Sequence, residues 1–379
     1  PADLGAFLGQ YFRSIPLSDL KARDPENLAG AALGHLAFGS ARKPGEPLAR
    51  IFNPVREEDG WESSHTIVEV VTDDMPFLVD SLGMVINNHN MYIHLTVHPV
   101  LTVRRDDVGR LIQVLPPGET AEDAVAESYM HLEIDREADP EIFEAIRNDV
   151  LSALDDVRLA CQDWRTMRAK ALEICAELKT SPPPLSAEIV EEGRALLAWM
   201  EDDHFTFLGY REYELVKGEE SDTLKVIPNT GLGILRKPST GGGGTVVSRG
   251  IRRQARSRDL LVITKANSRS TVHRPTYLDY VAVKHFDSAG LVIGEKRFLG
   301  LFTSVAYNRN PRSIPVLRHK VRQVMIQSGF RPDSHGGKAL QHILDTFPRD
   351  ELFQASVDEL AHISEGIQSL QERQQVKLF

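Results

Sequence analysis

The segment TDDMPFLVDSLGMVINNHN, residues 72–90, brings together polar residues that could do chemistry. Its two adjacent carboxylates, Asp73 and Asp74, are of the type that enzymes use in pairs as general acid and base. Asp74, however, stands before Met-Pro at the start of an apolar run, where a carboxylate caps the free N–H groups of a helix. We therefore predict a capping role for Asp74. The N–H groups at such a helix start can also bind the carboxylate of a small ligand.

Three histidines at or beyond the end of this segment, His89, His94 and His98, have the side chain that most often binds metals. Residues 92–106 alternate apolar and polar side chains and therefore indicate a strand. Positions 94 and 98 of a strand lie ~13 Å apart at ~3.3 Å per residue, whereas zinc ligands converge to about 2.1 Å from one ion. We predict no metal site here.

Two glycine-rich segments lack the neighbours that a nucleotide site needs. Gly-Leu-Gly at 231–233 has no third glycine and no following helix, and the tract at 241–244 has no Lys-Ser/Thr. The sequence also has no Gly-x-Ser-x-Gly elbow and no cysteine in a catalytic setting. We therefore expect no catalytic residue and no cofactor in this chain.

The segment RGIRRQARSR, residues 249–258, concentrates five arginines beside the glycine tract. A solvated basic loop is the simplest interpretation, and nucleic acid, an acidic ligand and a subunit interface are the alternatives. Without interleaved aromatic residues it is a poor platform for nucleic acid. The candidate residues of this loop are Arg249, Arg252, Arg253, Arg256 and Arg258.

The composition limits the class of protein. The chain has 379 residues and a formal net charge of −10 at pH 7, which predicts two or three domains and argues against nucleic acid and anionic membranes as partners. No apolar run is long enough for a transmembrane helix. The two cysteines, Cys161 and Cys175, are too few for a disulfide framework and favour reduced thiols in a cytoplasmic protein.

The elements that must position these residues follow from periodicity. Asp24 and Pro25 mark the start of a helix over 24–38. Further along, apolar spacing predicts a buried strand, a helix, three more strands and a second helix, at 65–72, 75–88, 92–106, 110–115, 127–135 and 139–154. Residues 156–164 fit either a last strand or more helix.

The second half of the chain begins with helices at 163–178 and 186–200, joined by a stiff Pro-rich linker at 180–184. Strand candidates then follow at 204–216, 224–236, 259–266, 271–286 and 290–307, and helices return from 313. The last four residues alternate again, which suggests the start of another domain. We expect a helical segment at 1–60, a domain at 61–165, a helical connector at 166–202, a β-rich domain at 203–308, a helical segment at 309–375 and a truncated domain at 376–379.

The order of elements in 65–164 resembles the ACT module, a ferredoxin-like βαββαβ fold that often binds amino acids between its first strand and first helix. Several segments go further and resemble the N-terminal regulatory region of the large-subunit bacterial NAD-dependent glutamate dehydrogenases, namely TDDMPFLVDSLGMVINNHN, HPVLTVRRD, NSRSTVHRPTYLDYVAVKHFD, GEKRFLGLFTSVAY and FPRDELFQASVDEL. The resemblance runs from about residue 5 to the end. It implies an α+β chain with an ACT-type module, a β-rich PAS-like module and helical connectors.

The chain departs from amino-acid-binding ACT modules at one residue. Those modules often have Asp-x-Pro-Gly at the first loop, and here Phe77 follows Asp74-Met75-Pro76. A bulky ring replaces the glycine that lets a ligand approach the backbone, which favours packing or a subunit contact. The candidate effector site is therefore Asp73, Asp74, Met75, Phe77 and Leu78.

The resemblance implies a non-catalytic regulatory or oligomerisation fragment of an enzyme that converts glutamate to 2-oxoglutarate and ammonia with NAD. NAD would belong to the parent enzyme. The expected partners are the downstream catalytic domain and further copies of the chain. Two alternatives stay open: a module that binds an amino-acid effector, and a purely structural spacer and subunit interface.

Overall fold

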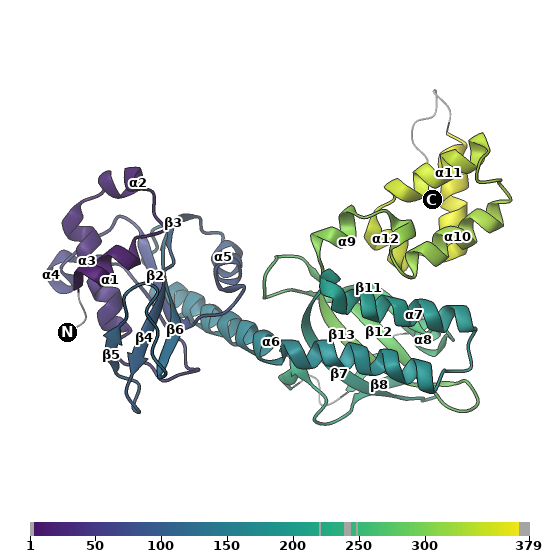
Figure 1. Ribbon diagram of the computed structural model, residues 1–379, viewed down its shortest axis with the longest axis horizontal. Coiled ribbons are helices and arrows are strands. Elements are labelled where there is room, and N and C mark those ends of the chain that lie inside the picture. The colour runs from purple at the N-terminus through teal and green to yellow at the C-terminus, as the bar shows by residue number, and fades with distance from the viewer. Residues whose placement is uncertain (1–3, 220, 239–243, 248, 371–379) are drawn as a thin grey trace. The chain divides into compact units, whose positions relative to one another are not determined.

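The computed structural model describes residues 4–219, 221–238, 244–247 and 249–370. The chain divides into two compact units, Pro1–Cys161 with Thr271–Pro275, and Gln162–Ser270 with Thr276–Phe379 (Figure 1). Both units combine helices with one antiparallel sheet, as the α+β prediction requires. The predicted stub at 376–379 and the glycines at 241–243 lie outside the described residues.

The sheet of the first unit has six strands, all paired antiparallel, in the order β1-β2-β6-β4-β5, with β3 also on β6. The strands are β1 (Leu48–Phe52), β2 (Thr66–Asp73), β3 (Ile93–Val97), β4 (Val100–Arg105), β5 (Leu111–Val114) and β6 (Ala124–Ile134). The predicted long strand over 92–106 is thus two strands, interrupted at His98-Pro99, because proline removes a ladder donor.

The last strand of the expected βαββαβ order is not formed. Residues 156–164 belong to α6 (Pro140–Thr180), because neither proline nor glycine interrupts the chain between 141 and 180 and the apolar period of a helix persists. The edge beside β2 is occupied instead by β1, which lies in the segment expected to be helical. The other predicted helix of the module is α5 (Leu78–Asn88).

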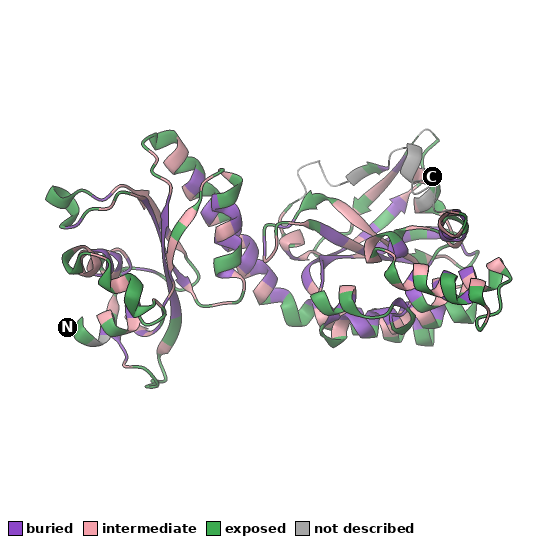
Figure 2. Ribbon diagram, turned by 90° about the horizontal axis from the view of Figure 1, so that it is seen from above, coloured by how far each residue is buried: buried purple, intermediate pink, exposed green. Residues whose placement is uncertain are grey.

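Four short helices belong to this unit: α1 (Leu4–Tyr11), α2 (Leu17–Lys21), α3 (Pro25–Phe38) and α4 (Arg56–Asp59). Of these, α1 and α3 share apolar clusters with the sheet face that carries Ile67, Glu69 and Val71. The predicted start of α3 is confirmed, since the Asp24 side chain accepts a hydrogen bond from the Glu26 amide and Pro25 is the first residue. An apolar cluster of α1, α3 and the sheet is built on buried residues such as Phe7, Tyr11, Ala32, Val71 and Tyr129. Figure 2 shows buried segments, in purple, along the strands of this sheet.

The second unit has a seven-stranded antiparallel sheet in the order β10-β8-β7-β13-β12-β11, with β9 on β7. Its strands are β7 (Phe205–Val216), β8 (Asp222–Val226), β9 (Leu232–Gly233), β10 (Gly244–Val247), β11 (Leu261–Arg269), β12 (Tyr277–Phe286) and β13 (Val292–Phe302). The C-terminal part of α6 and helix α7 (Ala187–Trp199) share a core with this sheet, in which Met167, Ile174, Leu196, Tyr210 and Phe298 are buried.

The remaining elements of this unit are short or helical. They are the π-helical turn η1 (Met200–His204), the 3-10 turns η2 (Ile234–Arg236) and η3 (Pro311–Ser313), and α8 (Arg249–Arg256), α9 (Ser304–Asn308), α10 (Leu317–Ser328), α11 (His335–Thr346), α12 (Arg349–Gln354) and α13 (Val357–Gln368). Gly329 ends α10 with a φ of 67°. Among the described residues, no helix is both long and apolar enough to cross a membrane.

Candidate functional site

The loop between β2 and α5 holds its two carboxylates in separate, occupied positions. Asp73 accepts hydrogen bonds from Arg42 Nη2 at 2.6 Å and from the Gly45 amide at 2.9 Å. Asp74 accepts from Ser128 Oγ at 2.6 Å. The prediction that Asp74 caps the helix is therefore wrong: α5 starts after Phe77, and no side chain caps it. The two carboxylates do not form an acid–base pair.

Asp73 belongs to a buried ion network on the sheet. Glu127 is fully buried and receives Arg42 Nη2 at 2.7 Å and Arg105 Nε at 2.6 Å on one carboxylate oxygen. The side chains of Arg42 and Arg105 are 0% and 4% exposed. The attraction between these opposite charges offsets the free-energy cost of removing them from water. The network fixes the residues around the start of the loop and offers no free carboxylate for catalysis.

Phe77 adopts an unusual backbone conformation. Its φ is 74°, the left-handed region that a glycine occupies without strain. Its ring lies 4.9 Å from the ring of His273, which also has a positive φ, of 73°. The His273 amide donates to Ser81 Oγ at 3.2 Å, and His273 Nδ1 lies 3.3 Å from Asp80 Oδ2. Segment 271–275, expected as part of a strand, therefore packs against the start of α5.

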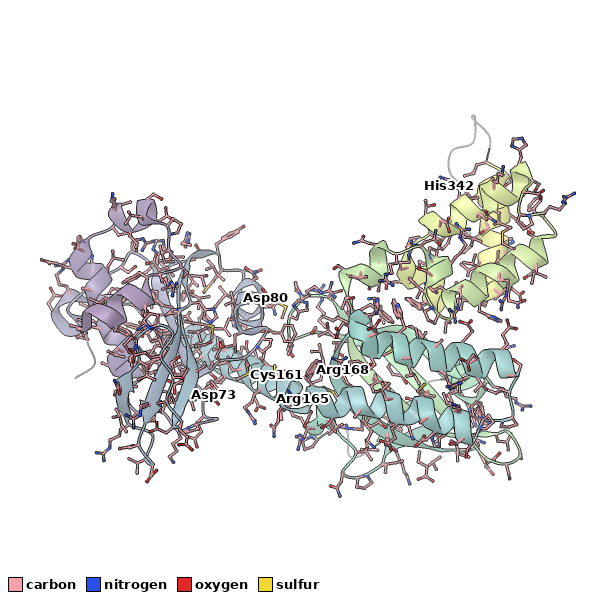
Figure 3. The ribbon with its side chains drawn as sticks, viewed as in Figure 1. Asp73, Asp80, Cys161, Arg165, Arg168 and His342 are labelled. Carbon is pink, nitrogen blue, oxygen red and sulfur yellow. The ribbon has the colours of Figure 1, made fainter. Side chains whose placement is uncertain are left out.

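None of the five residues predicted to bind an effector lines the cavity that the structure describes in the first unit. Leu78 is 2% exposed and is a core residue, while Met75 is half-buried. Asp73 and Asp80, which stand before and after the loop, are labelled in Figure 3. Phe77, in contact with His273, occupies the position at which an ACT module often has glycine. The structure thus favours the packing interpretation of this loop.

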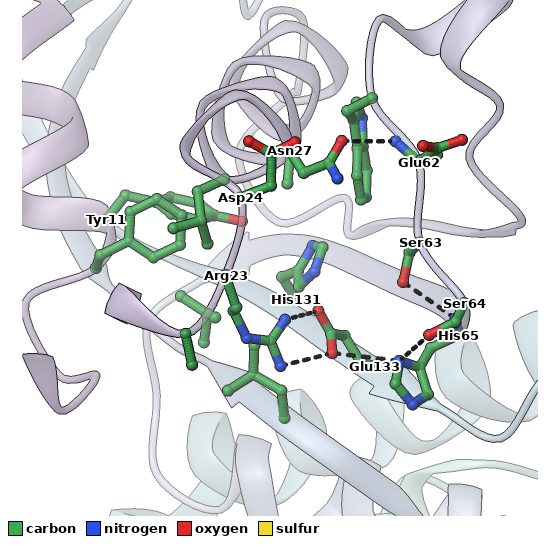
Figure 4. Close-up of a pocket in the computed structure, with 17 residues that line it drawn as sticks. Tyr11, Arg23, Asp24, Asn27, Glu62, Ser63, Ser64, His65, His131 and Glu133 are labelled. Atoms are coloured by element: carbon green, nitrogen blue, oxygen red, sulfur yellow. Dashed lines mark hydrogen bonds and ion pairs between the residues drawn. The ribbon is translucent and has the colours of Figure 1, made fainter. Parts of the chain in front are cut away.

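A cavity of about 440 Å³ lies in the first unit against the sheet face covered by α1–α3 (Figure 4). Buried Trp61 and the side chains of Phe12 and Leu95 form apolar walls. Arg23 binds Glu133 through Nη2–Oε2 at 3.0 Å and through a shorter second contact at 2.5 Å. Sequence analysis assigned none of these residues to a site.

A buried group of His35, Glu69 and His131 adjoins this cavity, and His131 lines it. His35 Nε2 lies 3.2 Å from the Val70 carbonyl oxygen, so it carries the hydrogen, and Nδ1 accepts from Tyr11 Oη at 2.8 Å. Glu69 is bound by His131 Nδ1 at 3.2 Å and by Arg50 Nε at 2.7 Å. Both ring nitrogens of His35 are in use and Arg50 neutralises Glu69, so this group does not fit a metal ion.

Burial and neighbouring groups compete in setting the pKa values of this group. It lowers the pKa of His35 to about 4, which keeps the ring neutral. Burial would raise the pKa of Glu69, but the opposing effects of His35, His131 and Arg50 are larger and hold the pKa of Glu69 at about 2. Glu69 is thus a carboxylate whose hydrogen bonds fix the position of the His131 ring.

The arginine-rich segment forms helix α8 rather than a loop. Arg256 donates to both oxygens of Asp222 at 2.7 Å, and Arg252 Nε lies 3.3 Å from the same carboxylate, which is fully buried. Arg258, after the helix, donates to the Pro184 carbonyl oxygen at 2.8 Å. Arg253 is exposed. Arg252, Arg256 and Arg258 therefore hold the second unit together, and the side chain of Arg249 lies outside the description.

The three histidines of the rejected metal set lie apart, each beside its own partner. His89 Nε2 is 2.9 Å from Asp149, His94 Nε2 is 2.7 Å from Asp135, and His98 Nε2 is 3.0 Å from Ser128 Oγ. Among the described residues, only His35, Glu69 and His131 meet the distances of a metal cluster. Cys161 and Cys175 are free and partly buried.

The sequence indicates these buried polar residues by their position inside predicted strands. Glu69 interrupts the apolar strand HTIVEVVT, and Tyr129, His131 and Glu133 alternate in ESYMHLEID. A charged residue inside such a strand indicates a buried partner. The pattern does not say which partner, because Glu69 pairs with His131 from 62 residues away.

Two family models match the chain. Residues 7–150 match "Glutamate dehydrogenase, ACT1 domain", and residues 314–373 match "Glutamate dehydrogenase, helical motif 1". The chain is 38% identical over 382 residues to the NAD-specific glutamate dehydrogenase of Halomonas elongata, an alignment that covers 100% of this chain. This chain belongs to the NAD-specific glutamate dehydrogenase family. The expectation of an ACT-type domain is confirmed by the first family model.

Two further family members show the same relation. The NAD-specific glutamate dehydrogenase of Pseudomonas aeruginosa is 38% identical over 375 residues, which is 98% of this chain, and that of Mycobacterium tuberculosis is 26% identical over 358 residues, which is 93%. The chain spans 24%, 23% and 21% of the lengths of these three proteins. About three-quarters of each family member therefore has no counterpart in this chain.

Proposed function

We propose that this chain is the non-catalytic regulatory and assembly region of an NAD-specific glutamate dehydrogenase. The observation that carries the proposal is the alignment over the whole chain to enzymes about four times as long. The carboxylates that first suggested catalysis support it, because Asp73 and Asp74 are bound to Arg42, Gly45 and Ser128. Oxidation of glutamate with NAD would then belong to the remainder of the parent enzyme.

An activity assay tests this proposal. We expect the purified chain to form no NADH from glutamate and NAD above a buffer control, while a full-length family member assayed alongside forms it. The chain must be shown to be folded, by its circular dichroism and a cooperative thermal transition. Glutamate-dependent NADH formation by the folded chain would contradict the proposal.

An assembly role has support at the sheet edges. The edge strand β5 exposes Ile112 to 52%, and the edge strand β10 of the second unit exposes Val246 to 65%. Exposed apolar edge strands are sites at which another chain adds. We expect sedimentation to show homo-oligomers, and charge substitutions such as Ile112→Lys and Val246→Lys to shift the population toward monomer. Wild type that stays monomeric at high concentration would oppose this role.

An amino-acid effector at the β2–α5 loop is the second candidate. Residues other than glycine that adopt the left-handed conformation are strained, and they are found most often at ligand and active sites. Phe77 is such a residue. A ligand carboxylate there would have to displace the ring from His273. Calorimetry with the common amino acids tests this: heat that Phe77→Ala changes supports the site, and no heat at millimolar ligand rejects it.

We propose that the second unit is a PAS-like module. We also expect the protein to be cytoplasmic. The sheet of the second unit places the first and last long strands, β7 and β13, side by side at the centre, and α6 and α7 share a core with one face. This arrangement supports the PAS-like interpretation that the sequence resemblance suggested. The proposed function does not require the second unit to bind a ligand.

A further inference from the structure

We propose that the cavity beneath α1–α3 binds a small organic amine with an apolar body. This inference goes beyond the proposed function and does not depend on it, because it concerns binding by the first unit alone. The site is the cavity of about 440 Å³, which falls within the range of small-molecule pockets, roughly 300–1,000 Å³. Its walls are those of a ligand pocket: Trp61, Phe12 and Leu95 provide apolar surface, and a few polar groups converge (Figure 4).

His131 supplies the polar atom that calls for a ligand. Its side chain is 3% exposed and lines the cavity. Its Nδ1 bonds Glu69, and its Nε2 has no hydrogen-bond partner among the residues that the structure describes. Because the Glu69 carboxylate can only accept, Nδ1 carries the hydrogen, and Nε2 is the ring atom left for a ligand. A polar group of a ligand in the cavity would give Nε2 a hydrogen-bond partner.

The charges around the cavity select a cation. Its lining includes three carboxylates, Asp24, Glu62 and Glu133, and one guanidinium, Arg23. Arg56, which lies 3.5 Å from Asp24 and 3.3 Å from Glu62, offsets one of them. One net negative charge remains, so an ammonium is favoured over a carboxylate.

Glu133 is the residue that would bind the ammonium. It is 7% exposed; Arg23 donates to both of its oxygens, and His65 Nδ1 lies 3.5 Å from Oε2. A carboxylate has about four acceptor sites, so it can receive an ammonium as well. The indole of Trp61 adds cation–π attraction and apolar contact to the body of the ligand. The ligand class is therefore a primary amine with an aromatic or aliphatic body.

Three probes with the same body separate the possible head groups: phenethylamine, phenylalanine and 3-phenylpropionate. We expect calorimetry on the full 379-residue chain to rank them amine, zwitterion, acid, with no binding of the acid. Tightest binding of phenylalanine would replace the free amine by an amino acid and overturn the stated class. Equal binding of amine and acid, or no binding of the amine at millimolar concentration, would overturn the site.

Two pairs of variants locate the binding. Ala31 lines the cavity and is 7% exposed, so Ala31→Leu fills space and should abolish binding, whereas Ala37→Leu on the exposed side of the same helix should not. If Ala31→Leu lowers the thermal midpoint too far for a binding assay, Glu133→Gln decides. It removes the charge at nearly constant shape and should weaken the amine about tenfold, and Glu144→Gln, on a side chain 67% exposed, should leave it unchanged. Unchanged binding in Glu133→Gln would overturn the assignment.

Discussion

The left-handed conformation of Phe77 predicts an inverted order of stability between two substitutions. We compare Phe77→Gly with Phe77→Ala. Both remove the ring and its contact with His273, so the loss of packing is shared. They differ only at the backbone, whose φ of 74° glycine adopts freely and alanine does not. Elsewhere in helices alanine is the more stabilising of the two.

The magnitude follows from two opposing terms. A residue with a Cβ is destabilised by roughly 1–2 kcal/mol in the left-handed region. Glycine lowers stability by about 0.5–1 kcal/mol because it has greater conformational freedom in the unfolded chain. We therefore expect Phe77→Gly to be more stable than Phe77→Ala by about 0.5–1 kcal/mol. At Asn87, an exposed residue in the last turn of the same helix, the order should be reversed by a similar amount.

Urea unfolding measures both differences if the signal comes from the first unit. Trp61 is in that unit, whereas Trp164 and Trp199 are in the second. A background with Trp164→Phe and Trp199→Phe makes Trp61 the only indole, and all four variants are compared in it. If Phe77→Ala proves as stable as Phe77→Gly, while the Asn87 pair behaves normally, the left-handed conformation is not strained and our reasoning about this loop is refuted.

Two further predictions concern buried charge. Glu127→Gln leaves Arg42 and Arg105 buried without their carboxylate and should cost about 3–5 kcal/mol of unfolding free energy, whereas Asp73→Asn, at a carboxyl 37% exposed, should cost under about 1 kcal/mol. If urea unfolding gave the same loss of unfolding free energy for Glu127→Gln and Asp73→Asn, the result would contradict the buried ion network. Burial lowers the pKa of His35 from about 6.5 unfolded to about 4 folded, so the unfolded chain binds the extra proton. Stability of the first unit should therefore fall as pH drops from about 6.5 to about 4. Between about pH 6.5 and 4.5 the slope should be shallower in His35→Gln, since Glu69, whose pKa is lowered from 4.5 to about 2 on folding, affects stability mainly below about pH 4.5.

Local periodicity predicted the elements well where one face of an element is apolar. The strand at 65–72 and the helix at 75–88 are present as β2 and α5, and 110–115 does pair with the preceding strand. The helix start was misplaced because Asp74, a good cap by type, is bound to Ser128 54 residues away. Partners this distant decide the role of a polar residue, and periodicity carries no information on them. The same limit hid the pairing of Arg256 with Asp222, so that a helix was taken for a loop.

The alternation of β2 and β6 explains where a ligand site can lie in the first unit. Pairing places Glu69 opposite His131 and Asp73 opposite Glu127, so these charged side chains share one sheet face, and the other presents Val68, Val70 and their neighbours. Buried charge persists only when it is paired or used. On this face Asp73 and Glu127 pair with Arg42, Glu69 pairs with Arg50 and His131, and His131 also lines the cavity. Phe77 and His273 fill the loop where an ACT module often binds its ligand. We therefore expect the ligand site of this unit to be the cavity on the α1–α3 face.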